Sequence, residues 1–588
     1  MSMDIKINRR FNEKDLPDVK TIKDRGDKLA KEVTIKETEF MRHYGVKSEG
    51  EYKRRCMKEG HIMKHSHTGW NSIEYSAETF KKIYNTLKDA GSYVDRFGVC
   101  LDGSMGVPEE DRDKVVVGSG QVYRSDEEWS LLGQITPACI HMGDHMIGSL
   151  NSVNNCMNAL NAGVTTIGNA SHYFSYEYPG FDMEEKRTFD VCTAFRIMGN
   201  FRETGSIIHS NLDDGYGAQF HDLANLVGWA RLERYCVEDL LGGAMNHCFG
   251  NLFSDPILRI IFSKAMWNIN TFQTPGSMIY GNTTDFADNY PKNYGALASF
   301  SMADIIGQMK WPTGHAVTAI PVTEAVRVPS AEEIIDAEFV LDIMLEKAAD
   351  YAKFIDFDAI EAQADTLTKC GTIFFERVIN ALDDLGTDIE HPGEVLAMLK
   401  AIGPERLEIN FGSGKKDLNA IRTRVPVYPT NIVKDINKQS DNLMATLHGV
   451  EGNPLDGMNI VIGTTDIHIF GKEVVKRVLR TAGANLYDLG DAVSADEFAD
   501  TLIETESKVL CVSTYNGMAY GFAQELDKKL KEKGLDDVLV IFGGRLNEAV
   551  DGEDLPVDVS DKLQAMGINT DNDAQKLVDT LTALNKKA

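Results

Sequence analysis

The sequence predicts an α/β protein of at least two domains. The chain is 588 residues long, and at this length one hydrophobic core stops growing, so chains divide into domains. Strand-like apolar runs alternate with amphipathic helix-like runs through most of the sequence, and the alternation is most regular in residues 458–588. Alternating strands and helices are typical of parallel βα units.

The chain divides into four predicted segments. Residues 1–70 are rich in charge and have helical periodicity, which indicates an N-terminal helical extension. Residues 71–440 contain a long run of βα units, and a run of this length permits a closed barrel as well as an open sheet. Residues 441–457 are polar with Gly and Pro near their end and are predicted to form a linker. Residues 458–588 form the last domain.

The last domain has four strand–helix repeats. In order, the predicted strands are "MNIVIG", "ANLYDLG", "KVLCVS" and "DVLVIFGG", and each is followed by an amphipathic segment. The first of these segments, "GKEVVKRVLRTAG", ends at a glycine, and the second, "SADEFADTLIETE", begins with a serine N-cap and acidic residues. Four such repeats predict a doubly wound, flavodoxin-like domain, in which ligands bind beyond the carboxyl ends of the strands.

Three polar or glycine-containing features follow the ends of those strands. They are Asp466-x-His468-x-x-Gly471, Ser513 and the pair Gly543–Gly544. A neutral imidazole is a good ligand for a transition metal. A carboxylate two residues away can accept the hydrogen bond of its other ring nitrogen. Because one histidine cannot hold a bare ion, the metal is expected to arrive already chelated in a macrocycle.

The serine and the glycines suit a bulky, flat ligand. Gly471 lets the chain turn closely into its helix, Ser513 can bond a buried polar group, and the glycine pair leaves space beside the backbone. Taken singly, each feature has an ordinary structural interpretation: a loop histidine with protein partners, a strand-end hydroxyl, and a tight turn.

Together, these features resemble the cobalamin-binding motif of enzymes in which a protein histidine replaces the dimethylbenzimidazole below cobalt. The runs "VIGTTDIHIFG", "ETESKVLCVSTYNG" and "GLDDVLVIFGG" resemble the small subunit of the glutamate mutase family. The resemblance implies that His468 is the lower cobalt ligand and Asp466 its partner. It also implies that Ser513, Gly543 and Gly544 line the pocket for the nucleotide tail.

The preceding segment resembles the large subunit of the same family, which implies a TIM-like (β/α)8 barrel and adenosylcobalamin as the cofactor. The stretch "PVTEAVRVPS" matches the segment that contacts the adenosyl group, so Glu324 is expected to accept hydrogen bonds from the ribose. A lysine that precedes this glutamate in the family is replaced by Ile320.

The substrate residues depart from that family. Only Arg96 matches one of its substrate-binding arginines, and neutral Asn155 occupies the position of its ammonium-binding glutamate. An alkylammonium without a buried anion is costly. A single chain that contains both the barrel and the cobalamin domain, without a site for an ammonium group, therefore resembles the 2-methyleneglutarate mutases, which act on a dicarboxylate.

His172 and Tyr176 follow a predicted strand end, where barrels place catalytic residues, although aromatic packing explains them equally well. Arg124, Arg187 and Arg196 are weaker candidates for binding carboxylates.

Two histidine groups have competing interpretations. His61, His65 and His67 are predicted to lie on a glycine-bounded loop, in substrate contact or on the surface rather than around a metal. His141, Asp144 and His145 precede the predicted substrate strand and are either donors in the cavity or buried polar residues.

The predicted function is an adenosylcobalamin-dependent radical carbon-skeleton mutase, an isomerase, acting on a small dicarboxylate such as 2-methyleneglutarate or a glutamate-like acid. The alternatives are a cobalamin-dependent methyltransferase and a non-catalytic cobalamin sensor or carrier.

A formal charge of −28 argues against nucleic-acid binding. The sequence contains neither a membrane-spanning run nor a signal peptide, and its nine cysteines are scattered, so a cytoplasmic protein with reduced thiols is expected. The family predicts a homodimer or higher homo-oligomer.

Overall fold

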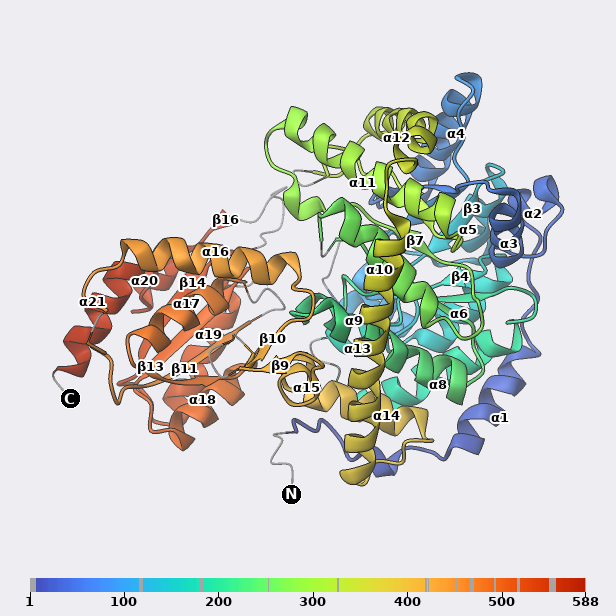
Figure 1. Cartoon of the computed structure of the whole chain (residues 1–588). Helices are drawn as coiled ribbons and strands as arrows, with labels where there is room; N and C mark the ends of the chain where they lie inside the picture. Colours follow the sequence, from blue (N-terminus) through green and yellow to red (C-terminus); the bar gives the residue numbers. More distant parts are fainter. Residues whose placement is uncertain are drawn as a thin grey trace. The chain divides into compact units, whose positions relative to one another are not determined.

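The computed structural model describes residues 7–586 apart from residues 116–119, 177, 179–180, 182, 252, 325–326, 418–419, 421, 451, 466–469, 491–492, 516–518 and 549–556. The chain divides into two compact units (Figure 1). The first consists of Met1–Lys416 and Arg424–Thr430, and the second of Asp417–Thr423 and Asn431–Ala588. In the part of the chain that the structure describes, no helix has the length and apolar character needed to cross a bilayer.

The first unit is a parallel (β/α)8 barrel, as predicted. Its described strands follow the order β6-β5-β4-β3-β2-β1-β8-β7. A bridge between Phe249 and Ile279 joins the two ends, where the Tyr280 N–H donates to the Phe249 carbonyl at 2.8 Å. The strands are β1 (Lys64–Thr68), β2 (Arg96–Val99), β3 (Cys139–Met142), β4 (Thr166–Ile167), β5 (Ile207–Asn211), β6 (Met245–Cys248), β7 (Met278–Ile279) and β8 (Ala316–Thr318).

Amphipathic helices surround the barrel. The first, α4 (Ile73–Asp89), begins at Ser72, whose side chain accepts from the Tyr75 N–H, and it buries Phe80 and Ile83 against the strands. The next helices are α5 (Asp126–Leu131), α6 (Ser152–Asn161), α7 (His172–Ser175), α8 (Glu184–Asn200), α9 (Leu223–Arg234), α10 (Pro256–Asn268), α11 (Tyr290–Lys310) and α12 (Ala331–Ala352). Further helices of this unit are α1 (Val19–Ala30), α2 (Glu39–Tyr44), α3 (Glu49–Glu59), α13 (Phe357–Asp384), α14 (Pro392–Ile402) and α15 (Pro404–Phe411). A short hairpin, β9 (Lys415–Lys416) and β10 (Arg424–Val425), follows α15.

The first 70 residues build part of the barrel and are more than a helical extension. Strand β1 lies within them, and α3 closes the end of the barrel where the strands begin. From α3, the buried Lys53 ammonium donates to the carbonyls of Ser277 and Gly314, which precede β7 and β8, at 3.0 and 2.9 Å. The barrel therefore has a closed floor at its amino end.

The second unit contains a four-stranded parallel sheet of order β12-β11-β13-β14, the flavodoxin-like order predicted for it. The strands are β11 (Asn459–Thr464), β12 (Asn485–Asp488), β13 (Val509–Thr514) and β14 (Leu539–Gly544). The helices are α16 (Asn431–Thr446), α17 (Phe470–Thr481), α18 (Ala495–Glu504), α19 (Ala519–Glu532), α20 (Ser560–Ala565) and α21 (Ala574–Asn585). Strands β15 (Asn547–Glu548) and β16 (Val557–Asp558) pair beside them.

Both faces of this sheet are buried, which explains its continuous apolar strands. Val461 on β11 packs in a core that includes Phe498 of α18, whereas Ile460 and Ile462 face a second core that includes Leu479 of α17. Buried residues from the segment predicted to be a linker, Leu447, Val450 and Leu455, belong to the second core. These three residues therefore pack into the domain in this structure.

Candidate functional site

In the second unit, the predicted cofactor residues gather at one edge of the sheet. Ser513 pairs in register with Thr464 on one side and with Gly543 on the other. All three residues stand at the carboxyl ends of neighbouring parallel strands, the edge at which doubly wound sheets bind ligands. Asp466 and His468 lie outside the described residues, in the connection between Thr465 and α17.

A cavity of about 300 Å³ opens at this edge. Gly471, Ser513, Gly543 and Gly544 all line it, together with apolar side chains from β11, β14, α16, α17 and α21. These apolar residues include Leu443, Ile462, Val475, Ile541 and Leu577, and polar residues 571–573 lie at the start of α21. We call this cavity the apolar slot. Its mainly hydrocarbon lining with a few polar groups is typical of a site for a flat organic ring.

Glycine is required in the slot wall for two different reasons. Gly544 has a φ of +94°, and a Cβ built on it would lie 2.3 Å from the Thr514 carbonyl oxygen, so a side chain there would be both strained and obstructed. A Cβ on Gly471 would lie 3.6 Å from the Ser513 Oγ, an ordinary contact distance. The absence of a side chain at Gly471 therefore leaves room in the slot beside the serine.

A buried ion cluster fixes α17 beside the slot. The Lys472 ammonium lies 2.8 Å from an Asp488 carboxylate oxygen, and Lys476 contacts both Asp488 and Glu473. Burial alone would raise the pKa of Asp488, but the two ammonium groups hold it well below its usual range. Asp488 stands at the end of β12, so the cluster connects the helix that carries Gly471 to the neighbouring strand.

In the first unit, five basic side chains lie inside the barrel: His65 and His67 on β1, Arg96 on β2, His141 on β3 and His209 on β5. We call this group the histidine lumen. Its members are neighbours. His65 pairs in register with Arg96 on the next strand. The ring centroid of His141 lies 6.3 Å from that of His65 and 4.5 Å from that of His209. Glycine makes space for them: a Cβ on Gly98 would lie 2.4 Å from the His67 Nδ1.

Several buried polar atoms of the lumen have no hydrogen-bond partner in the protein. Among the described residues these atoms are His65 Nε2, His67 Nδ1, Arg96 Nη2 and His141 Nε2. Buried polar groups in native proteins are nearly always satisfied by protein, water or ligand. An unsatisfied set of this kind, converging from several strands, therefore marks a place where a polar molecule binds.

The charge of the lumen resides on Arg96. Burial, followed by the nearby Arg96 guanidinium, lowers the pKa of His65, His141 and His209 well below the ordinary histidine value, and lowers that of His67 to about 4. These imidazoles are therefore neutral at physiological pH. The Arg96 Nε lies 2.9 Å from the Glu49 carboxylate, while its Nη1 lies 3.2 Å from the Met278 Sδ.

Asn155 is engaged entirely by protein groups. Its amide nitrogen donates to the carbonyls of Met105 and His145 at 2.7 and 3.1 Å, and its amide oxygen accepts from Asn151 at 2.9 Å. In this structure Asn155 holds the loop after β3 in place, with its amide nitrogen bonded to two backbone carbonyls.

His172 and Tyr176 lie together at the carboxyl end of β4. Their rings stack with centroids 4.0 Å apart, and the His172 Nδ1 accepts from the His145 N–H at 3.3 Å. Arg187 fixes this turn by donating to the His172 carbonyl at 2.7 Å. Glu324 follows β8 and is exposed, and the buried Ile320 precedes it.

Sequence reasoning missed part of the barrel site. It placed His65 and His67 on a loop, whereas the structure places them on β1, where the alternation in "KHSHT" directs both side chains inward. It also did not single out Cys100, His209 and Asp214, each of which lies on or just after an apolar strand-like run. Of the weaker arginine candidates, Arg196 pairs with Asp27 at 2.6 Å and Arg124 is exposed.

The comparisons identify relatives for a part of the chain. The glutamate mutase sigma subunit of Carboxydothermus hydrogenoformans is 35% identical over 114 residues, which cover 19% of this chain and 81% of that subunit. The sigma subunit of Clostridium tetanomorphum is 29% identical over 117 residues, 20% of this chain and 83% of that subunit. No family model matches the chain.

A third relative and one solved structure were also found. Sigma subunit 2 of the Haloarcula marismortui glutamate mutase is 32% identical over 127 residues, 21% of this chain and 82% of that subunit. The structure of a cobalamin-binding protein from Desulfitobacterium hafniense covers 39% of this chain and 97% of its own, with 20% identity. Its TM-score of 0.19 is too low to support an inference.

Proposed function

Because the chain belongs, through 19% of its length, to the glutamate mutase sigma subunit family, we propose that it is an adenosylcobalamin-dependent radical carbon-skeleton mutase. Its substrate is a small dicarboxylate, such as 2-methyleneglutarate or a glutamate-like acid. The observation that carries the proposal is the apolar slot, which Gly471, Ser513, Gly543 and Gly544 line together.

The slot fits the nucleotide tail of the cofactor. A flat benzimidazole can lie against the apolar residues of the slot, and the Ser513 hydroxyl can hydrogen-bond a polar atom at its end. A side chain on Gly471 would occupy this space. On this proposal His468 binds cobalt from below and Asp466 orients its imidazole, while Glu324 accepts hydrogen bonds from the adenosyl ribose. Bound adenosylcobalamin would supply a 5′-deoxyadenosyl radical through homolysis of its cobalt–carbon bond.

The barrel residues bind and orient the acid. The Arg96 Nη2 has no partner in the protein and is available to donate to a substrate carboxylate. The free Nε2 of the neutral His65 ring can donate to a carboxylate or carbonyl oxygen, because its Nδ1 faces the Arg96 guanidinium. The free Nε2 of the neutral His141 ring can accept a hydrogen bond, because its Nδ1 donates to the Thr166 carbonyl. A barrel of this kind keeps a substrate away from water, which protects a reactive radical from side reactions.

Label exchange tests the proposal. The holoenzyme is incubated with adenosylcobalamin tritiated at the 5′ carbon and with a panel of dicarboxylates, including acids with and without an amino group. The hydrogen that the radical abstracts and returns mixes with the label, so tritium is expected to enter one acid and its isomer. Parallel incubations without acid, or with methylcobalamin, set the background.

Retention of all tritium in the cofactor with every acid would contradict radical catalysis on the tested class. Extraction of methylcobalamin from the purified protein, with methyl transfer to an acceptor, would replace the mutase by the methyltransferase alternative. The acid that takes up label also decides whether the substrate has an amino group.

A further inference from the structure

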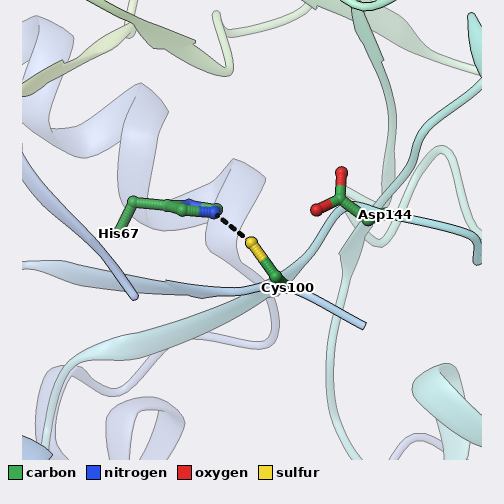
Figure 2. A group of neighbouring side chains, drawn as sticks. All are labelled: His67, Cys100 and Asp144. Atoms are coloured by element: carbon green, nitrogen blue, oxygen red, sulfur yellow. Dashed lines mark hydrogen bonds between the residues drawn. The ribbon is translucent and has the colours of Figure 1, made fainter. Parts of the chain in front are cut away.

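Three potential metal ligands converge at the carboxyl end of the barrel (Figure 2). His67 lies on β1, Cys100 immediately follows β2, and Asp144 is two residues beyond β3. The His67 Nε2 lies 3.1 Å from the Cys100 Sγ, and one ligand atom of each residue lies within 4.8 Å of the others. Figure 2 shows the thiol between the imidazole and the carboxylate. All three side chains are half-buried, so an ion could reach them.

The next strands add His172 and Asp214 beside this group. The His172 Nε2 is buried without a hydrogen-bond partner, and it lies 3.9 Å from the Asp144 Oδ1 and 3.8 Å from the Asp214 Oδ2. Because its Nδ1 accepts from the His145 N–H, a neutral His172 carries its proton on Nε2. His172 is therefore unsuited to bind a metal itself, but it is aimed to donate to the Asp144 carboxylate.

We propose that His67, Cys100 and Asp144 form a binding site for a zinc-like divalent cation. Imidazole nitrogen, thiolate sulfur and carboxylate oxygen are the ligand types that zinc prefers. One thiolate and one carboxylate neutralise the two positive charges of the ion, while the imidazole contributes no charge. His172 supplies the outer hydrogen bond that orients a ligating carboxylate, a contact that metal sites commonly require.

Three protein ligands leave a fourth position open, which is the arrangement of catalytic rather than structural zinc sites. That position lies at the mouth of the barrel, so the ion could bind and polarise a carboxylate or carbonyl oxygen of a small acid. The proposal rests on barrel side chains alone and does not require that the second unit bind cobalamin.

Metal titration of the full-length chain, produced without cobalamin so that no cofactor cobalt is present, tests this site. After treatment with a chelator, zinc is added in competition with a chromophoric chelator. We expect one tightly bound zinc per chain and an affinity at least about 100-fold lower for C100S, H67Q and D144N. The matched control is C370S, because Cys370 is a half-buried thiol on α13 outside the group; it is expected to bind zinc as the unmodified chain does.

A second measurement needs no variant at Cys100. Zinc is expected to protect Cys100 from alkylation at least about tenfold, with the modified cysteine identified by mass spectrometry, while Cys370 reacts at the same rate with and without zinc. Equal alkylation of Cys100 in both conditions, or zinc affinity in C100S equal to that of the unmodified chain, would overturn the proposal. Neither readout involves mutase activity, so failure of the zinc site and failure of the mutase proposal remain distinguishable.

Discussion

The apolar slot of the second unit and the histidine lumen of the barrel are chemically opposite. The slot lies at the carboxyl ends of its strands, whereas the lumen runs inside the barrel from Arg96, the first residue of β2, to His67 near the end of β1. The slot is lined mainly by hydrocarbon and glycine around Ser513, whereas the lumen presents buried imidazole and guanidinium nitrogens without protein partners. The slot therefore selects a ligand by shape, and the lumen selects one by charge and hydrogen bonding.

The largest difference between the two units is expected in their stability at mildly acidic pH. The pKa values of His65, His141, His209 and His247 in the barrel lie well below the ordinary histidine value of about 6.5. Burial is the main cause, and it lowers those of His145 and His315 to about 3. Below pH 6.5 the unfolded chain binds protons that the folded barrel does not, so stability falls as pH falls. Each such histidine costs on the order of 1 kcal/mol per pH unit between about pH 6.5 and 4.5.

The second unit should resist the same acidification. The only histidine among its described residues, His448, is exposed. The depressed pKa of Asp488 stabilises the unit above the unfolded aspartate value of about 3.9, and this contribution is lost only as pH falls below that value. Hydrogen exchange, corrected for intrinsic rates, should show loss of protection in β1–β6 but not in β11–β14. Equal loss of hydrogen-exchange protection in both units would contradict the predicted difference in acid stability.

The next largest effect should follow from removing the lumen's guanidinium. Arg96→Met removes one of the two cations beside the buried Glu49 carboxylate and leaves Lys53, 3.3 Å away, as the other, so the barrel should lose about 1.5–3 kcal/mol of unfolding free energy in urea. Adding Glu49→Gln should cost less in this background than in the unmodified chain, because the interaction of Glu49 with Arg96 is already lost. Arg124→Met, at an exposed arginine, is the matched control and should change stability by about 0.5 kcal/mol or less. Additive losses for the two substitutions would show that the pair is not coupled.

Filling the slot should weaken cobalamin binding without harming the fold. Gly471 lies in the first turn of α17, where leucine is a better helix former, and the added side chain would occupy the slot. Gly471→Leu should weaken cobalamin binding roughly 100-fold in a spectroscopic titration, and Gly471→Ala should weaken it less. Gly295→Leu on α11, where a Cβ meets open space, is the matched control. Unchanged affinity in Gly471→Leu would remove the slot from the cofactor site.

The smallest effect is expected at the slot's serine. Ser513→Ala removes one hydroxyl and its hydrogen bond, worth about 1 kcal/mol, so cobalamin affinity should fall about five- to tenfold. Cys511→Ala, also on β13 in the slot wall, serves as the control for loss of a small side chain without loss of a hydroxyl. Equal effects of the two substitutions would mean that the hydroxyl makes no specific contact.

The second unit was the more predictable from sequence, because its local signals are consistent. All four predicted strands occur, and Ser494 caps α18 by accepting from the Glu497 N–H, as its position predicted. Register then places Ser513 beside Gly543. The segment around Leu447 and Val450 was read as a linker because its apolar residues are sparse, and only tertiary packing reveals that they are buried.

The barrel was less predictable because its strands are polar where barrel strands are usually branched and apolar. In β1, "KHSHT" has the alternation of a strand, but its inward residues are His65 and His67, so hydrophobic periodicity did not identify it. Convergence of His67, Cys100 and Asp144 depends on the alignment of three strands distant in sequence. Local patterns contain no information about that alignment.

The central claim is that His468 binds cobalt while the nucleotide tail lies in the slot, and electron paramagnetic resonance tests it most directly. The protein is produced with ¹⁵N-labelled histidine, loaded with unlabelled cobalamin and reduced to the cobalt(II) state. If a protein histidine is the lower ligand, the nitrogen splitting of the cobalt lines changes from triplets to doublets on labelling, and His468→Gln abolishes that change. Triplets that persist in the labelled protein would mean that the cofactor's own dimethylbenzimidazole is bound, and they would contradict the account.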